Sequence, residues 1–320
     1  MTIERARVQE LPKPWGVIDG MPWSEAGHDG LAIGEICFER SGLAAAGPAL
    51  LLKVLLTRQP LSIQVHPDDA LARSMGLSNG KTEAWFVLSA RPGAKVALGL
   101  KQSMTKLQLR AAITDGSIAD RVAWRGVAAG DVVSVPAGTI HAIGAGLVIA
   151  EIQQRSDTTF RLFDHGRSRE LHIDVALAAA SAEPADTQPE KRQLTSERTL
   201  LAANAHFVFE RVELAPDSTW CVEACRETWL LVVDGAARAG EFEVVKGNAV
   251  FAEGDRVLLR AGAGGVVCVV AYTAGEGPIS QLLHQLPQCG ATVFQESMPM
   301  QVARIATEES AAPALRGTIQ

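Results

Sequence analysis

The sequence lacks closely spaced cysteine pairs, basic clusters and long apolar runs, and each absence excludes a class of protein. The five cysteines are odd in number and form no Cys-x-x-Cys pair, so neither a disulfide framework nor a zinc ribbon is indicated. The net charge of -6 and the scattered arginines make nucleic acid an unexpected partner. No apolar run approaches about 18 residues, and the charged N-terminus does not resemble a signal peptide. We therefore expect reduced thiols, no membrane partner and a cytoplasmic protein.

The length of 320 residues allows two hydrophobic cores. A stretch rich in Ala, Glu and Pro follows residue 175 and is typical of a linker. We expect an N-terminal domain over residues 1–175, a linker over 176–200 and a C-terminal domain over 201–320. Short helices are expected over 70–75 and 103–115.

The most informative stretch is residues 130–144, which reads GDVVSVPAGTIHAIG. A β-branched strand over 131–135 ends at Pro136, and a return strand begins near His141. The spacing of Gly130, Pro136 and His141 resembles the second motif of the cupin superfamily, whose histidine points into a small β-barrel and binds a metal. A single histidine after a hairpin is more often a buried, hydrogen-bonded side chain, so further ligands are needed.

Two earlier strands offer such ligands. Ser62, Gln64 and His66 are spaced two apart, so they project from one face of a strand. That polar face is either exposed to solvent or lines a polar interior site. Glu83 and Trp85 share a face of the strand over 81–89. A buried carboxylate there requires a partner or a metal, unless Glu83 lies at a wet rim.

Together, Gln64, His66, Glu83 and His141 supply two imidazoles, a carboxylate and an amide oxygen. This set of N and O donors suits Zn²⁺ and does not exclude Mn²⁺, Co²⁺, Fe²⁺ or Ni²⁺. Without thiolate ligands and with a neutral glutamine, the ion stays electrophilic, which favours a catalytic site over a structural one.

The second half repeats the first without these ligands. Glu227 and Trp229 echo Glu83 and Trp85, whereas Leu258 stands at the position of His141. With the cupin resemblance, this predicts a mainly β fold of two cupin-like β-barrel (jelly-roll) domains with a few short helices. Only the N-terminal barrel is expected to carry a metal site.

Over most of residues 10–175, the chain resembles the class I mannose-6-phosphate isomerase (phosphomannose isomerase) family in its short bacterial form. The segments that carry the resemblance are KPWG, LSIQVHPDD, NGKTEAWFVL, GDVVSVPAGTIHAIG and EIQQRSDTTFRLFDHGR. The resemblance implies one zinc ion per chain on the four residues named above, and it makes Arg161 the active-site arginine. It also implies a substrate pocket with Trp15, Lys53, Ser62, Lys81, Glu151, Asp157 and Arg167.

Two residues depart from the family pattern. Phe160 stands where Tyr is frequent, and Arg167 stands where some members have Lys. Neither residue belongs to the metal set, but Arg167 leaves the phosphate contacts open.

The implied reaction interconverts mannose 6-phosphate and fructose 6-phosphate through a cis-enediol. A metal and the charge of Arg161 stabilise the enediolate. Glu151 is the first choice for the proton-shuttling base and Lys81 the second, since a lysine would need a depressed pKa. Lys53, Ser62 and Arg167 are expected to hold the phosphate.

Two other functions fit a cupin metal site. A cupin dioxygenase or oxidase with Fe²⁺ or Mn²⁺ would consume oxygen, but such cupins commonly present three histidines and a Glu, whereas this chain has Gln64. A non-catalytic sugar-phosphate-binding cupin would bind ligand without turnover. The partner expected in every case is a small phosphorylated sugar, and the chain is expected to be a monomer or a weak dimer.

Overall fold

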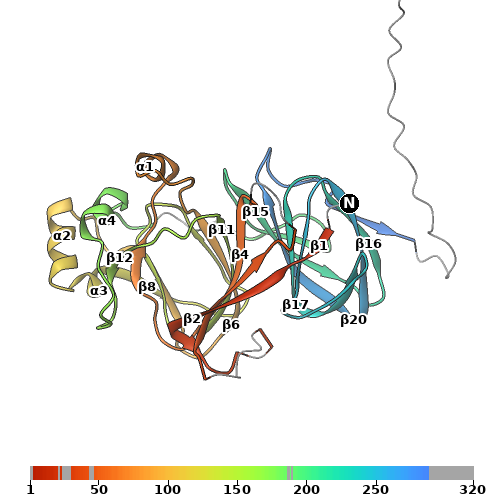
Figure 1. The fold of residues 1–320 in the computed structure, drawn as a ribbon, viewed down its shortest axis with the longest axis horizontal. Helices are drawn as coiled ribbons and strands as arrows, with labels where there is room; N and C mark the ends of the chain where they lie inside the picture. The colour runs from red at the N-terminus through yellow and green to blue at the C-terminus, as the bar shows by residue number, and fades with distance from the viewer. Residues whose placement is uncertain are drawn as a thin grey trace, which may run out of the picture. The chain divides into compact units, whose positions relative to one another are not determined.

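The computed structural model describes residues 3–20, 22–23, 30–42, 47–185, 188 and 190–287, which fall within one compact unit. Their strands form three antiparallel sheets, accompanied by short helices (Figure 1). No helix in this part of the chain is long and apolar enough to cross a membrane. The expected mainly β fold is confirmed.

The N-terminal half is a sandwich of two sheets. The six-stranded sheet has the order β2 (Arg7–Val17), β3 (Ile33–Glu39), β4 (Leu50–Thr57), β11 (Leu147–Gln154), β6 (Glu83–Ala90) and β9 (Val132–Val135). The five-stranded sheet has the order β12 (Phe160–Phe163), β5 (Ile63–Val65), β10 (His141–Ile143), β7 (Lys95–Leu100) and β8 (Val122–Gly126). Side chains of both sheets, among them Trp85, Ile149, Val96 and Ile143, share one apolar cluster. The two sheets therefore face each other.

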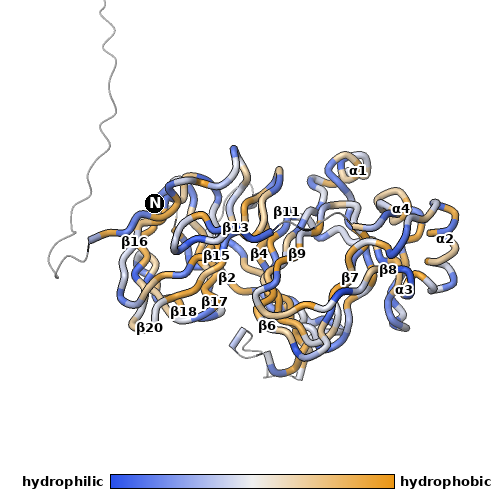
Figure 2. The backbone as a smooth tube through the Cα atoms, turned by 180° about the vertical axis from the view of Figure 1, so that it is seen from behind, coloured by the Kyte–Doolittle hydropathy of each residue, from blue (hydrophilic) through white to orange (hydrophobic). Residues whose placement is uncertain are grey.

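Strand β4 is buried on both faces, as its almost continuous apolar sequence LLLKVLLT requires (Figure 2). Leu50, Leu52, Val54 and Leu56 pack in a cluster that includes Phe209 and Trp229 of the C-terminal half. The residues of β4 between these, Lys53 among them, face the interior of the sandwich. Lys53 is consequently only 5% exposed.

Four helices are described, and three cover the outer face of the five-stranded sheet (Figure 1). Helix α2 (Lys106–Thr114) begins with a capping box between Thr105 and Gln108, and α1 (Asp69–Ser74) is capped by Asp68. Both lie where the sequence predicts helices. Buried residues of α2, α3 (Ile118–Arg121) and α4 (Ile173–Ala179) pack on the sheet.

The C-terminal half is built on a ten-stranded sheet around a second core. Strand β20 (Asp255–Thr273) pairs with β16 (Thr219–Ala224) over its first part and with β15 (Phe207–Leu214) over its second, while β17 (Thr228–Ala239) pairs with both parts. The sheet thereby wraps its own core. Its other strands are β1 (Ile3–Arg5), β13 (Arg192–Gln193), β14 (Arg198–Ala203), β18 (Phe242–Val245), β19 (Ala249–Ala252) and β21 (Leu283–Leu286).

The two cupin-like units are thus present, although no sheet of the described chain closes into a continuous barrel. The first strand, β1, pairs with β19 in the C-terminal sheet, and α4 spans residue 175. The expected division after residues 175 and 200 stays a prediction.

Glu227, which echoes Glu83 in the second half, hydrogen-bonds to backbone groups of β4 and its preceding residue. Its carboxylate accepts hydrogen bonds from the backbone N–H of Ala49 (2.5 Å) and Leu50 (2.9 Å), and from Trp229 Nε1 at 3.1 Å. The residue that echoes Glu83 therefore holds the start of β4.

The cysteines of the described chain are free thiols, as expected: Cys37 and Cys268 are buried, Cys221 is half-buried and Cys225 is exposed. Cys289 lies outside the described residues. Burial is the largest influence on the Cys37 thiol and raises its pKa to about 11.

Candidate metal centre and active-site cavity

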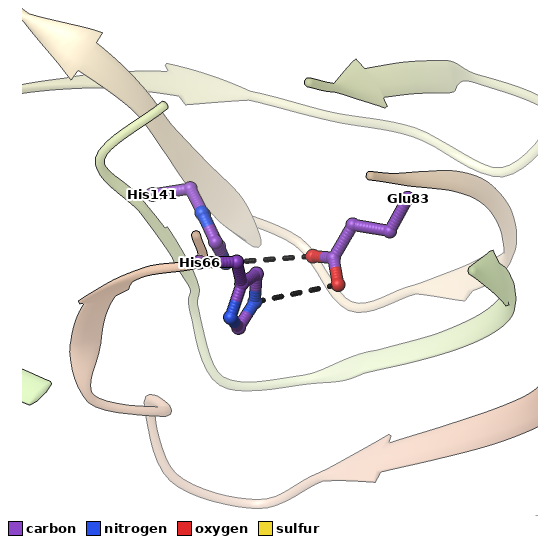
Figure 3. A group of neighbouring side chains, drawn as sticks. All are labelled: His66, Glu83 and His141. Atoms are coloured by element: carbon purple, nitrogen blue, oxygen red, sulfur yellow. Dashed lines mark ion pairs between the residues drawn. The ribbon is translucent and has the colours of Figure 1, made fainter. Parts of the chain in front are cut away.

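The four predicted ligand residues converge from both sheets of the N-terminal sandwich. Gln64 on β5 lies opposite His141 on β10, so their side chains share a face. His66 follows β5 directly, and Glu83 begins β6 in the facing sheet. Ligand atoms of His66, Glu83 and His141 lie within 4.8 Å of one another, and all three residues are buried (Figure 3).

Backbone carbonyls fix the orientation of both imidazoles. Nδ1 of His66 is 2.9 Å from the carbonyl oxygen of Thr158, and Nδ1 of His141 is 2.9 Å from that of Thr139. A carbonyl only accepts, so each Nδ1 carries the proton and donates it. The Nε2 lone pairs are left to face Glu83, with each Nε2 atom 3.4 Å from a carboxylate oxygen.

The charge states of this group suit a metal. Burial, followed by the positive charge of Lys81, lowers the pKa of His66 to about 3. Burial also lowers the pKa of His141. Burial opposes the charge of Glu83 as well, but Lys81 and then His66 hold the pKa of that carboxyl well below its usual range. Two neutral imidazoles and a carboxylate are the ligand forms that a divalent ion requires.

The hydrogen bonding of the Glu83 carboxylate supports the same fit. Within the described residues, Glu83 Oε2 accepts no hydrogen bond of good geometry, although Lys81 Nζ lies 3.1 Å away. Two nitrogen lone pairs and a carboxylate directed at one another repel, although Lys81 Nζ also lies 3.3 Å from His66 Nε2. A cation held by His66, Glu83 and His141 would remove this repulsion.

Gln64 lies beside this group. Its Nε2 is 3.2 Å from His141 Nε2, and its Oε1 accepts a hydrogen bond from Ser62 Oγ at 3.0 Å. The Ser62 hydroxyl can accept as readily as it donates, so rotating the amide by 180° preserves that contact. The rotated amide would direct its oxygen at the metal ligands.

A cavity of about 330 Å³ adjoins the metal ligands. It lies between the two sheets, and its size is within the range of small-molecule sites. The predicted site residues that line it are Trp15, Lys53, Ser62, Gln64, Lys81, Glu83, Glu151, Asp157 and Arg161.

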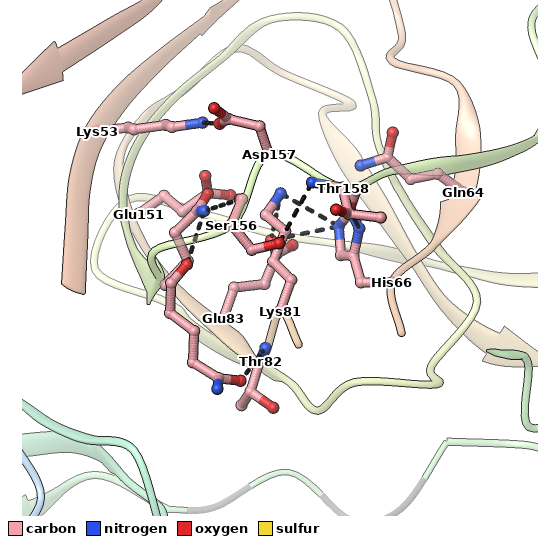
Figure 4. Close-up of polar contacts among 12 residues, drawn as sticks. Lys53, Gln64, His66, Lys81, Thr82, Glu83, Glu151, Ser156, Asp157 and Thr158 are labelled. Atoms are coloured by element: carbon pink, nitrogen blue, oxygen red, sulfur yellow. Dashed lines mark hydrogen bonds and ion pairs between the residues drawn. The ribbon is translucent and has the colours of Figure 1, made fainter. Parts of the chain in front are cut away.

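Several charged side chains of the cavity are paired with one another (Figure 4). Lys53 Nζ is 3.3 Å from Glu35 and 3.8 Å from the exposed Asp157. Burial disfavours the charge of Lys53, but the carboxylates of Glu35 and Glu151 outweigh it and raise its pKa. The ammonium group of Lys53 is therefore buried and paired with carboxylates.

Glu151, the predicted base, is 4% exposed. It faces Trp85 across the β11 and β6 pair and accepts a hydrogen bond from the indole Nε1 at 2.9 Å. The same indole meets the ring of His141 edge-on. Burial, then the nearby charge of Glu83, raises the pKa of Glu151 to about 7. A carboxyl with this pKa exchanges a proton readily at neutral pH.

The two predicted arginines differ in their surroundings. Arg161 lines the cavity, donates from Nη1 to the carbonyl of Glu170 at 2.7 Å, and has a buried Nε without a hydrogen-bond partner in the described chain. Arg167 does not line the cavity. Its guanidinium donates to Asp164 and to the carbonyl of Pro60.

Sequence reasoning missed three charged residues that line the cavity: Lys13, Glu35 and Arg169. Glu35 carries the signal that singled out Glu83, an acid inside an apolar strand. Lys13 and Arg169 lie in polar segments, where no periodicity distinguishes a lining residue from an exposed one.

The fold and the site define a cupin-type β protein with a candidate metal centre beside a charged cavity. No family model matches the sequence. The mannose-6-phosphate isomerase of Streptococcus mutans is 34% identical over 218 residues, which are 66% of this chain and 67% of that protein. Mannose-6-phosphate isomerase ManA of Bacillus subtilis is 32% identical over 230 residues, or 67% of this chain and 70% of that protein.

A solved structure shows the same fold. The crystal structure of mannose 6-phosphate isomerase from Bacillus subtilis superimposes with a TM-score of 0.71 at 21% identity, covering 85% of this chain and all of that one. The chain belongs to the mannose-6-phosphate isomerase family, a family of isomerase enzymes. This agrees with the resemblance inferred from its motifs.

Proposed function

We propose that this protein interconverts mannose 6-phosphate and fructose 6-phosphate, with one zinc ion per chain. The names of its relatives support this reaction. The observation that carries the proposal is the convergence of His66, Glu83 and His141 on one point beside the cavity. A cytoplasmic location and a monomeric or weakly dimeric state remain predictions from the sequence.

His66, Glu83, His141 and a rotated Gln64 would hold the metal. When bound, a divalent ion supplies Lewis-acid stabilisation to the oxygens of the sugar. The absence of thiolates and the neutral amide favour this use of the ion, and the N and O donor set suits zinc.

The reaction moves one proton from C2 of the aldose to C1, and a second from the C2 hydroxyl to the C1 oxygen, through a cis-enediol. We assign the carbon proton to Glu151, whose buried carboxyl has a pKa of about 7. Lys81 is the alternative base, because its Nζ lies beside Glu83 within the same cavity. The guanidinium of Arg161 would stabilise the negative charge that develops on the oxygens.

Trp15, Lys53, Ser62 and Asp157 line the cavity and would orient the sugar phosphate. The phosphate is distant from the reacting carbons, so binding of the phosphate can fix the positions of C1 and C2 without taking part in the chemistry. A direct contact from Arg167 stays a prediction.

The test is a metal analysis combined with an isomerase assay. Chelation should abolish mannose 6-phosphate conversion, and added Zn²⁺ should restore it. A rate that persists in metal-free enzyme would contradict the metal-dependent mechanism. Oxygen uptake would instead support a cupin oxygenase, and sugar-phosphate binding without turnover would support a binding protein.

A further inference from the structure

Strand β12, which carries Arg161, is the end strand of the five-stranded sheet. Within the described chain β5 is its one neighbouring strand, so the backbone groups on its outer side need partners of another kind. Arg161 lies opposite Gln64 in the pairing with β5. A shift of this edge at Arg161 would therefore move the guanidinium relative to the proposed metal ligands.

His172 supplies those partners. The N–H of Arg161 donates to Nδ1 of His172 at 3.0 Å, and the N–H of His172 donates to the carbonyl oxygen of Arg161 at 2.8 Å. The N–H and C=O of one strand residue point to the same side, so both groups of Arg161 point away from β5. One imidazole nitrogen and one backbone N–H thus take the place of a neighbouring strand.

The first of these bonds fixes the protonation of the His172 ring. A backbone N–H only donates, so Nδ1 must keep its lone pair, and the neutral ring carries its proton on Nε2. Burial and then the positive charge of Arg161 lower the pKa of His172, which keeps the ring neutral at neutral pH. The imidazole is therefore in the form that the contact with Arg161 requires.

The place of His172 in the fold holds its ring still. It is the N-cap residue of α4, yet its side chain caps none of the described backbone N–H groups of that helix. Helix α4 lies beside β12 and packs on the sheet through Ala176 and Leu177 (Figure 1). The acceptor that an N-cap residue usually offers to its own helix is directed at Arg161 instead.

The guanidinium of Arg161 is held from the same segment. Its Nη1 donates to the carbonyl oxygen of Glu170 at 2.7 Å. Residues 170 and 172 thus hold both the side chain and the backbone of Arg161. If Nδ1 of His172 were removed, the Arg161 N–H would lose its acceptor, and β12 would have to shift to satisfy that donor elsewhere.

We propose that His172 is a positioning residue, which accepts from the N–H of Arg161 and donates to its carbonyl and thereby holds the guanidinium at the cavity. This rests on the proposed function, because Arg161 acts in that reaction. His172 is not among the described residues that line the cavity. Its effect therefore passes through Arg161.

The experiment compares His172→Leu with His172→Asn in the zinc-loaded enzyme. Leucine removes the acceptor, whereas asparagine carries Oδ1 in the place of Nδ1. We expect His172→Leu to lower kcat for mannose 6-phosphate about 10- to 100-fold with little change in KM, since it displaces a group that acts in the transition state. His172→Asn should recover most of this loss. His206→Leu, at another half-buried histidine away from the cavity lining, is the matched control and should change neither constant.

Two further measurements separate positioning from a general loss of stability. In the Arg161→Ala background, His172→Leu should change the residual kcat by less than about threefold, because no guanidinium is left to position. Hydrogen exchange of the Arg161 amide, followed by NMR, should be about tenfold or more faster in His172→Leu than in the wild type at equal thermal stability. His172→Gln, whose amide lies one carbon further from the backbone, serves if the leucine variant does not fold.

Four outcomes would overturn the assignment. They are an unchanged kcat in whichever of His172→Leu and His172→Gln folds, an equal loss of kcat in His172→Asn, a further loss of the same size in the Arg161→Ala background, and an unchanged exchange rate of the Arg161 amide. Failure of the wild-type enzyme to convert mannose 6-phosphate would refute the proposed function instead. The exchange rate would then still test the contact without any turnover.

Discussion

His141 lies directly opposite Gln64 in the pairing of β10 with β5, and their side-chain nitrogens are 3.2 Å apart. On the other side of β5, Arg161 lies opposite the same Gln64. Directly opposed residues of antiparallel strands share a face, so Arg161, Gln64 and His141 form one row across the sheet. Two of the proposed metal ligands, Gln64 and His141, and the proposed catalytic arginine are therefore placed by the register of β5 with its two neighbouring strands.

Replacing His141 with alanine should strip the metal. The imidazole is completely buried, and its Nε2 is directed at Glu83, so no solvent ligand can take its place without rearrangement. We expect less than a tenth of the wild-type zinc content, measured by elemental analysis after dialysis, and a matching loss of activity. His284→Gln, at a partly exposed histidine far along the chain, should retain zinc. Full metal content in His141→Ala would refute its role as a ligand.

Arg161→Ala should keep the metal and the fold but lose turnover. Among the described groups the guanidinium donates a hydrogen bond only to a backbone carbonyl, so its removal leaves no buried carboxylate unpaired. We expect kcat to fall about 10²- to 10³-fold, the usual cost of losing a charge that stabilises a transition state. Zinc content and the thermal unfolding temperature should stay near wild type. An unchanged kcat would show that the arginine is misassigned.

Activity should depend on the ionisation of Glu151. A base must be deprotonated to accept a proton, and burial raises the pKa of this carboxyl to about 7. The value of kcat/KM should therefore rise with pH through a midpoint near 7 and level off at higher pH. That midpoint lies above the ordinary pKa range of a glutamate.

Glu151→Gln is expected to lower kcat about 10²- to 10⁴-fold and to remove that midpoint. Glu151→Asp keeps a carboxyl group and should keep a midpoint in its residual activity. If the profile of Glu151→Gln retained the wild-type midpoint, Lys81 would become the better choice of base.

Glu227→Gln should destabilise the protein without affecting the metal. An amide in place of the carboxylate turns an N–H group toward the backbone N–H of Ala49 or Leu50, so a buried donor loses its acceptor. We expect the free energy of unfolding to fall by about 1–3 kcal/mol, measured by urea denaturation. Glu243→Gln is the matched control, since that side chain is 77% exposed, and it should change stability by less than about 0.5 kcal/mol. Equal stability of the two variants would mean that the Glu227 contacts contribute little.

The alternation of residues along the strands made much of the site predictable. Ser62, Gln64 and His66 share a face because side chains in a strand have a period of two, and Glu83 with Trp85 follows the same rule. Periodicity alone does not tell whether those faces are exposed to solvent or buried in the interior. The structure buries His66 and Glu83 to 1% exposure, which excludes the wet rim considered for Glu83.

Local sequence left the burial of Lys53 open and gave no signal at Arg169. A lysine in an apolar strand usually marks an exposed edge. Strand β4 is instead an inner strand that is buried on both faces, and Glu35 from the neighbouring strand pairs with the ammonium group of Lys53. Which of Arg167 and Arg169 reaches the cavity depends on how the loop after β12 folds around Asp164. Two arginines that are two residues apart give no periodic signal in a loop.

The sequence by itself determined the mainly β fold, the alternation that groups the ligand residues, and the membership of an isomerase family, because strand periodicity and motif spacing are local properties. The tertiary structure alone decided which polar faces are buried, which lone pairs face Glu83, and which charges are already paired. Those properties depend on strands brought together from distant parts of the chain, so solvent exclusion and the direction of each hydrogen bond follow only from packing.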